Sequence, residues 1–104
     1  MMTETARRVA ELVEAIPPGL VMTYGEVARA VGTSALTVGR ILNKHGHALP
    51  WWRVVDATGR PYKGAIERAK THLAEEGTPM AASGSDLRVD LKRASWMTDG
   101  GRRR

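Results

Sequence analysis

Apolar residues repeat at intervals of three and four positions in four stretches of the chain. These stretches cover residues 3–16, 24–31, 35–42 and 65–76. Because an α-helix has 3.6 residues per turn, the spacing predicts four helices, each with one buried face. The residues expected to face the core are Val9, Leu12, Val13, Ile16, Val27, Ala28, Val31, Val38, Ile41, Leu42, Ile66, Ala69 and Leu73.

The second and third predicted helices carry the signals of a helix-turn-helix. Thr23 and Glu26 have the three-residue spacing of a capping box at the start of the second helix. Gly32 is suited to end that helix and Ser34 to cap the next, so only a short link separates them. The pattern predicts a helix-turn-helix, although an ordinary helical hairpin packed in a core has the same spacing.

Residues 53–62 have the pattern of two short strands around a turn. The turn falls at residues 56–59, where an aspartate at the first position and a glycine at the fourth are typical of type I. Residues 53–55 and 60–62 are the predicted strands. A hairpin that follows a helix-turn-helix would form a wing.

The last third of the chain gives weaker signals. Residues 81–85 are small and are expected to form a loop, and the alternation of Leu87, Val89 and Leu91 predicts a short strand. Trp96 is expected to fold back onto the body of the protein. The predicted architecture is mainly α with a small β-hairpin, a winged helix-turn-helix.

Length and composition limit the class of protein. With 104 residues the chain is one domain, which we place at residues 1–98, followed by a basic tail at residues 99–104 that is expected to be disordered. The chain has 16 Lys plus Arg against 11 Asp plus Glu, a formal net charge of +5. This balance favours polyanionic partners, nucleic acid before acidic membranes.

The chain contains no cysteine, which excludes disulfides, thiolate metal sites and thiol nucleophiles. It has no apolar stretch of the ~20 residues needed to cross a bilayer, and its first residues lack a signal-peptide pattern. We therefore expect a cytoplasmic protein without membrane contact, and a monomer.

Two motifs carry a resemblance to a known family. Thr23-Tyr24-Gly25 leads into the predicted helix-turn-helix, and Pro50-Trp51-Trp52-Arg53-Val54 follows it. The chain resembles the DNA alkyltransferases that repair O6-alkylguanine, from about residue 5 to 76 and more loosely to Trp96. Those proteins have a similar Tyr-Gly segment and a Pro-Cys-His-Arg-Val motif with the alkyl-accepting cysteine. A tryptophan in place of that cysteine, here Trp51, is the mark of the alkyltransferase-like proteins.

The chemistry of the second motif argues against alkyl transfer. Transfer to protein needs a strong nucleophile, usually a thiolate with a neighbouring base. The indole of Trp51 is a poor nucleophile, and Trp52 occupies the position where the family has its histidine. Many alkyltransferase-like proteins keep that histidine, so Trp52 departs from their pattern as well. We expect a non-enzymatic protein.

The resemblance implies a pocket for a damaged base that has been rotated out of the duplex. An aromatic face there would contribute ~1–3 kcal/mol by stacking. The family position favours Trp51 for this role, whereas pocket wall and core packing are equally open for Trp52. Arg53 is expected to be structural, with its guanidinium holding nearby carbonyls or carboxylates. The residues predicted for the pocket are Trp51, Tyr24, Pro50, Trp52, Arg53, Lys63 and Gly64.

The resemblance also implies which surface faces DNA. Tyr24 matches the family tyrosine that presses on the phosphate 3′ of the target nucleotide. Leu36 stands where the family has an arginine that fills the gap left by the extruded base. Leucine can wedge between bases but cannot hydrogen-bond the unpaired cytosine, and Arg40 can reach a phosphate. The residues predicted to contact DNA are Tyr24, Thr23, Ser34, Ala35, Leu36, Thr37, Gly39, Arg40 and Lys44.

A second departure concerns Lys63 and Gly64. Some relatives have an arginine there that senses the O6 substituent, and Gly64 occupies this position here. The sequence therefore predicts DNA binding without identifying a residue that discriminates between lesions.

Other candidate sites are weak. His45 and His47 have a metal-like spacing, but no cysteine or carboxylate cluster completes a site, so we expect solvated loop histidines, no metal and no cofactor. Glu75 and Glu76 end the last predicted helix and are expected to be solvated. No glycine-rich loop precedes a helix as phosphate binding would require.

Three functions from different classes remain open. The first is a sensor that binds O6-alkylguanine in double-stranded DNA by flipping the nucleotide and directs the lesion to nucleotide excision repair proteins. The second is a transcription regulator that binds undamaged DNA through the winged helix-turn-helix. The third, an active alkyltransferase, is disfavoured by the missing cysteine. The resemblance favours the first.

Overall fold

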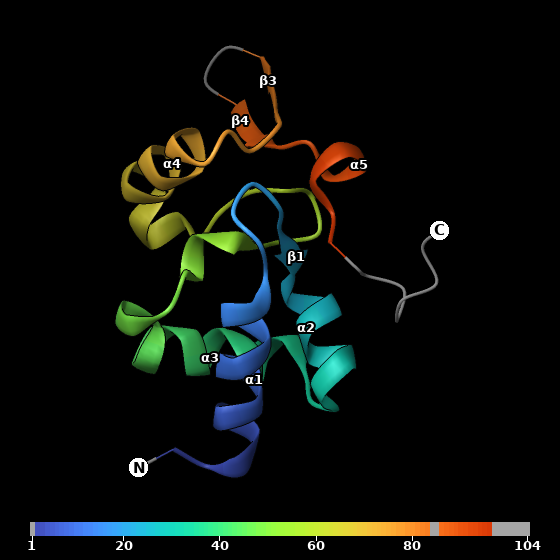
Figure 1. Cartoon of the computed structure of the whole chain (residues 1–104), viewed down its shortest axis with the longest axis vertical. Helices are drawn as coiled ribbons and strands as arrows, with labels where there is room; N and C mark the ends of the chain where they lie inside the picture. The colour runs from blue at the N-terminus through green and yellow to red at the C-terminus, as the bar shows by residue number, and fades with distance from the viewer. Residues whose placement is uncertain (1, 84–85, 97–104) are drawn as a thin grey trace.

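The computed structural model describes residues 2–83 and 86–96. Three helices form one end of the molecule: α1 (Glu4–Ala15), α2 (Tyr24–Val31) and α3 (Ala35–His45). As Figure 1 shows, α4 (Ile66–Glu75), strands β3 (Met80–Ser83) and β4 (Asp86–Val89), and α5 (Leu91–Ala94) lie toward the other end. The expected mainly helical fold with a small sheet is confirmed.

Local capping explains where the helix-turn-helix begins and ends. The side chain of Thr23 accepts a hydrogen bond from the amide of Glu26, whose carboxylate accepts one from the amide of Thr23. The two bonds make the predicted capping box. Gly32 ends α2 with φ of 92°, a left-handed conformation that a residue without Cβ adopts at little cost. The hydroxyl of Ser34 then caps α3.

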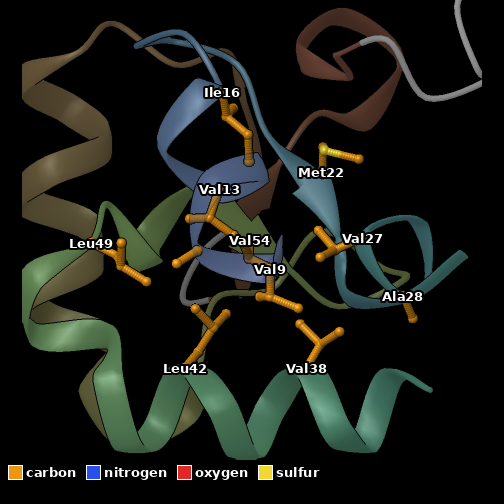
Figure 2. Close-up of a cluster of buried hydrophobic side chains, with 11 residues drawn as sticks. Val9, Val13, Ile16, Met22, Val27, Ala28, Val38, Leu42, Leu49 and Val54 are labelled. Carbon is orange, nitrogen blue, oxygen red and sulfur yellow. The ribbon is translucent and has the colours of Figure 1, made fainter. Parts of the chain in front are cut away.

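The first core cluster joins the three N-terminal helices. Val9 and Val13 of α1 point toward Val38 and Leu42 of α3, and Val27 of α2 closes the side (Figure 2). The apolar faces predicted from periodicity are therefore packed together. Removal of this apolar surface from water is the main stabilising contribution to the helix-turn-helix.

A short parallel strand pair separates this cluster from a second one. Strand β1 (Met22–Thr23) pairs with β2 (Val54–Val55), with Met22 opposite Val54. Successive strand residues point to opposite faces, so Met22 and Val54 belong to the first cluster while Val55 belongs to the second. The other buried members of the second cluster are Val21, Leu73, Val89 and Ala94.

The predicted wing at residues 53–62 is wrong in part. The turn forms: the amide of Gly59 donates to the carbonyl of Asp56, and Gly59 has φ of 93°. Residues 60–62 do not form a strand, and β2 pairs with β1. A side chain at Gly59 would also place its Cβ 2.3 Å from the carbonyl oxygen of Val89, so the turn packs closely on the backbone of Val89.

The antiparallel hairpin lies later in the chain. Strand β3 (Met80–Ser83) pairs with β4 (Asp86–Val89). Residues 81–83, expected to lie in a loop, are therefore part of a strand, and residues 84–85 of that expected loop lie outside the described residues. Leu87 and Val89 are in β4 as expected, but Leu91 begins α5. Trp96 packs on the first core cluster, as expected.

Ile66, expected on the buried face of α4, is 36% exposed at the start of that helix. Within the described part of the chain, no helix has the length and apolar character to cross a lipid bilayer. The tail at residues 99–104 lies outside the described residues.

Candidate nucleic-acid interface and base pocket

A small pocket opens between the helix-turn-helix and α4. Its volume is about 190 Å³, below the ~300–1,000 Å³ of sites that take drug-sized ligands. Both apolar and polar side chains line it, and none of its described lining residues carries a carboxylate. The lining residues are Tyr24, Gly39, Leu42, Asn43, Gly46, His47, Trp51, Tyr62, Ala65 and Arg68.

Trp51 forms one wall of this pocket. It begins the short 3₁₀ helix η2 (Trp51–Arg53), which leads directly into β2. The ring of Trp52 meets the Trp51 ring edge-on at 84°, with centroids 5.7 Å apart, and the His72 ring does the same at 83° and 6.1 Å. The Arg68 guanidinium carbon is 5.6 Å from the Trp51 ring centroid, in cation–π range. These contacts hold the indole of Trp51 in place.

Tyr24 lies at the junction of the pocket and a wider groove. It is the first residue of α2 and is half-buried. Burial, followed by the charges of Asp56 and Tyr62, raises the pKa of the Tyr24 phenol. The hydroxyl therefore stays protonated at neutral pH and can donate a hydrogen bond to an anionic oxygen.

The wider groove runs beside the start of α3. Leu36, in the first turn of α3, is 66% exposed, the most exposed large apolar side chain among the described residues. Ile66 and Tyr62 are also exposed on this groove. The lining residues are Tyr24, Gly25, Ala35, Leu36, Gly39, Arg40, Asn43, Asp56, Ala57, Arg60, Pro61, Tyr62, Lys63 and Ile66.

The charge of the groove is mainly positive. Arg40, Arg60 and Lys63 line it, against the single carboxylate of Asp56 among its described lining residues. Burial alone would raise the pKa of Asp56, but hydrogen bonds from Thr58 and from the Arg60 amide outweigh it and lower the pKa. Asp56 is thus charged and accepts hydrogen bonds within its own turn, and the basic side chains that line the groove still outnumber it.

The second tryptophan has a different environment. Trp52 stacks on His72 with a centroid distance of 3.8 Å and an interplanar angle of 9°. Its indole Nε1 donates to Oε2 of Glu76 at 3.0 Å. Trp52 packs against the second core cluster and does not line the pocket. Of the two alternatives left open by the sequence, the structure therefore favours packing.

Arg53 and Glu76 form the centre of a buried network. The Arg53 side chain donates to both carboxylate oxygens of Glu76, at 3.0 and 2.5 Å, and to the carbonyl of Ile16 at 2.8 Å. The amide of Gly19 also donates to Glu76. The Arg53 and Glu76 side chains are only 13% and 14% exposed. The network ties the end of α1 to η2 and α4, which corrects the expectation that Glu76 is solvated.

The charge state of the Glu76 carboxyl follows from these contacts. Burial alone would raise the pKa of its carboxyl, but the hydrogen bonds from Arg53, Trp52 and Gly19 outweigh burial and lower the pKa. The carboxylate is charged at neutral pH and fully paired. Glu75, in contrast, is exposed, as expected.

The structure brings together only part of the predicted pocket. Trp51 and Tyr24 line it, and so does Gly39, which had been assigned to DNA contact. Lys63 lines the wider groove instead. The predicted pocket residues that line neither hollow are Pro50, Trp52, Arg53 and Gly64.

The predicted DNA-contact residues divide in the same way. Ala35, Leu36 and Arg40 line the groove. The predicted contact residues outside both hollows are Thr23, Ser34, Thr37 and Lys44. Thr23 and Ser34 cap α2 and α3, and the Ser34 hydroxyl also donates to Thr37.

Sequence reasoning missed the contribution of α4. Arg68, His72 and Glu76 follow one another at intervals of four and so lie on one face of α4 and its C-cap. This polar row faces the two tryptophans. Four-residue spacing of polar residues beside the apolar face was the available signal. His47, expected to be solvated, is exposed and lines the pocket mouth, and the described residues contain no cluster that could hold a metal.

The fold and the groove together define a DNA-binding domain of the alkyltransferase type. The family model of the DNA-binding domain of 6-O-methylguanine DNA methyltransferase matches residues 4–78, and the chain belongs to this family. Among its relatives is the DNA base-flipping protein of Escherichia coli, 38% identical over 96 residues, which cover 86% of this chain and 72% of that protein.

A second relative is alkyltransferase-like protein 1 of Schizosaccharomyces pombe. It is 35% identical over an alignment 105 residues long, gaps included, and the alignment covers 91% of this chain and 96% of the relative. A crystal structure of S. pombe Atl1 in complex with damaged DNA containing O6-carboxymethylguanine matches this fold with a TM-score of 0.79 and 35% identity. That match covers 92% of this chain and 97% of the other.

Proposed function

We propose that this protein recognises O6-alkylated guanine in double-stranded DNA. The damaged nucleotide rotates out of the duplex and its base enters the pocket beside Trp51. The observation that carries this proposal is that Trp51 forms a wall of the pocket. By the resemblance of its motif, Trp51 also stands where the family has its acceptor cysteine. Stacking on the indole would contribute ~1–3 kcal/mol to binding.

The groove is the proposed contact with the duplex. Its cations would replace counterions along the phosphates, and Tyr24, at the junction with the pocket, would press on the backbone beside the flipped nucleotide. Leu36, exposed in the first turn of α3, is the proposed wedge for the gap that the base leaves. Leucine offers no hydrogen bond, so the opposite base would be read weakly.

The proposed role includes no alkyl transfer. The chain has no cysteine, and both aromatic residues of the second motif are poor nucleophiles. Incubation with DNA that contains O6-methylguanine should therefore leave the mass of the protein unchanged. A stoichiometric gain of one methyl group in the mass spectrum would contradict this part of the proposal.

Without transfer, the bound lesion has to be removed by other proteins. We propose that the complex directs the lesion to nucleotide excision repair, and that the protein acts as a cytoplasmic monomer. A pull-down with lesion-containing and unmodified duplexes would show whether excision repair proteins are retained only when both the lesion and this protein are present.

The central test compares two duplexes of one sequence, with and without a single O6-methylguanine. We expect tighter binding to the modified duplex, because a base with weakened pairing costs less to extrude and stacks on Trp51. Equal affinity for both, together with a preference for one particular sequence, would contradict the proposal and favour a transcription regulator.

A further inference from the structure

Arg68 is a cation in the pocket wall that belongs to neither of the two motifs of the sequence. It lies on α4 and lines the pocket together with Trp51. Its guanidinium carbon is 5.6 Å from the centroid of the Trp51 ring. The charge is therefore placed beside the surface on which an extruded base would stack.

Arg68 is exposed, and it forms no ion pair or hydrogen bond with another residue of the described ranges 2–83 and 86–96. Two cations close to it in the described structure differ in this respect. Lys70, two residues later on α4, pairs with Glu67, and Arg53 pairs with Glu76. The donors of Arg68 are thus available to a ligand.

The rest of the pocket wall does not neutralise this charge. Its polar side chains come from two tyrosines, an asparagine and a histidine, and none of the described lining residues is a carboxylate. Asp56, the carboxylate among the described lining residues of the adjoining groove, accepts hydrogen bonds from its own turn. An anionic group that enters the pocket would meet Arg68 without competition from a fixed carboxylate.

We propose that Arg68 determines specificity for O6 adducts that carry a carboxylate, such as O6-carboxymethylguanine. The planar guanidinium can remain against the Trp51 ring and still direct its N–H groups at a carboxylate, because stacking and in-plane hydrogen bonding use different parts of the group. This inference rests on the proposed function, since the adduct reaches Arg68 only if the base enters the pocket.

A DNA phosphate offers the same anionic chemistry as the adduct carboxylate. The two sources predict different results, because every duplex has phosphates and only the carboxymethyl lesion brings a carboxylate. The experiment measures binding of wild type and Arg68→Gln to three duplexes of one sequence with guanine, O6-methylguanine or O6-carboxymethylguanine. Arg29→Gln on the exposed face of α2 is the matched control.

We expect Arg68→Gln to weaken binding of the carboxymethyl duplex by about tenfold or more, the effect of a lost hydrogen bond to a charged group. Binding of the methyl and unmodified duplexes should change much less, and Arg68→Lys should retain part of the carboxymethyl affinity. Melting curves of the free variants, and measurements well below their melting temperatures, control for folding.

Equal losses on all three duplexes would assign Arg68 to a phosphate and overturn the inference, as would no loss on any of them. If wild type prefers the methyl lesion over guanine in either case, the proposed function stands and only the role of Arg68 is wrong. If wild type binds all three duplexes alike, both the inference and the proposed function fail.

Discussion

Trp51 and Trp52 are adjacent in the sequence and have identical side chains, but the structure gives them different surroundings. Trp51 lines a pocket and has an unpaired cation, Arg68, against its ring. Trp52 packs on the second core cluster, stacks on His72 and donates to Glu76. The turn of η2 separates them into a pocket-facing side and a structural side.

This difference shows how a pocket wall can be held in place by a network that lies outside the pocket. Glu76 receives hydrogen bonds from Trp52, Arg53 and the Gly19 amide, and through them fixes η2 against α4. Trp51 is presented to the pocket because its neighbours are fixed. Substitutions on the two sides should therefore separate stability from lesion recognition.

The largest effect is expected for Glu76→Gln. Loss of the charge leaves the largely buried Arg53 without its ion-pair partner, which should lower the free energy of unfolding by about 3 kcal/mol. Urea denaturation measures this directly. Glu75→Gln, at the exposed neighbouring position, should change stability by no more than ~0.5 kcal/mol. Similar small effects for both variants would show that the network is not the structural side of the comparison.

The pH dependence of stability sharpens this result. The pKa of Glu76 is lowered in the folded protein from its ordinary value of 4.5. The unfolded chain thus takes up its proton first, so stability from the carboxylate is present above pH 4.5 and is lost as pH falls through the folded pKa. The difference in stability between wild type and Glu76→Gln should shrink below pH 4.5. A difference that is constant with pH would show that the charge of Glu76 contributes little.

Next in size is the effect of Trp51→Ala on binding. We expect a loss of ~1–3 kcal/mol on DNA that contains O6-methylguanine and a much smaller loss on unmodified duplex, where few bases are extruded. Tyr24→Ala should also act mainly on the lesion duplex, because it raises the cost of extrusion. Fluorescence anisotropy with both duplexes measures the ratio.

Trp51 could instead be a packing residue like Trp52. In that case Trp51→Ala would lower the free energy of unfolding by ~3–5 kcal/mol and weaken binding to both duplexes in parallel. Melting temperatures recorded beside the two affinities separate these outcomes, and parallel losses would remove the distinction between the tryptophans.

A smaller effect is expected for Trp52→Phe. The ring can still stack on His72, but the hydrogen bond to Glu76 is lost, which should cost ~1 kcal/mol of stability. The ratio of affinities for lesion and unmodified DNA should stay at its wild-type value. A change in that ratio with stability intact would contradict the assignment of Trp52 to the structural side.

The smallest effect on lesion preference is expected for Arg40→Gln. Arg40 lines the groove, and phosphate contacts carry no base identity, so both duplexes should lose affinity about equally. The slope of log affinity against log salt should fall in magnitude by about one. An unchanged slope would show that this part of α3 does not face the backbone.

Local signals in the sequence determined the helix-turn-helix. The capping box of Thr23 and Glu26, the left-handed Gly32 and the Ser34 cap all act within a few residues. The buried faces of α1 to α3 followed from periodicity, and the family followed from two short motifs. Arg53 was expected to hold carbonyls and carboxylates, and its contacts with Ile16 and Glu76 confirm this.

The strand pairing was decided by the tertiary structure. The turn at residues 56–59 formed as predicted, because its hydrogen bonds lie within the turn. Residues 53–55 nevertheless did not pair with residues 60–62. Strand β2 pairs with β1 because this partner places Val54 and Val55 in separate cores, a gain that depends on residues far away in the sequence.

The division between Trp51 and Trp52 also required the fold. Both residues occupy positions that the motif marks as important, and the sequence left Trp52 open between pocket and core. What separates them is the row of Arg68, His72 and Glu76 on α4, which only packing of that helix against η2 brings into contact. Local hydrogen bonds depend on residues that are close together in the sequence, whereas the environment of a side chain depends on every element that packs around it.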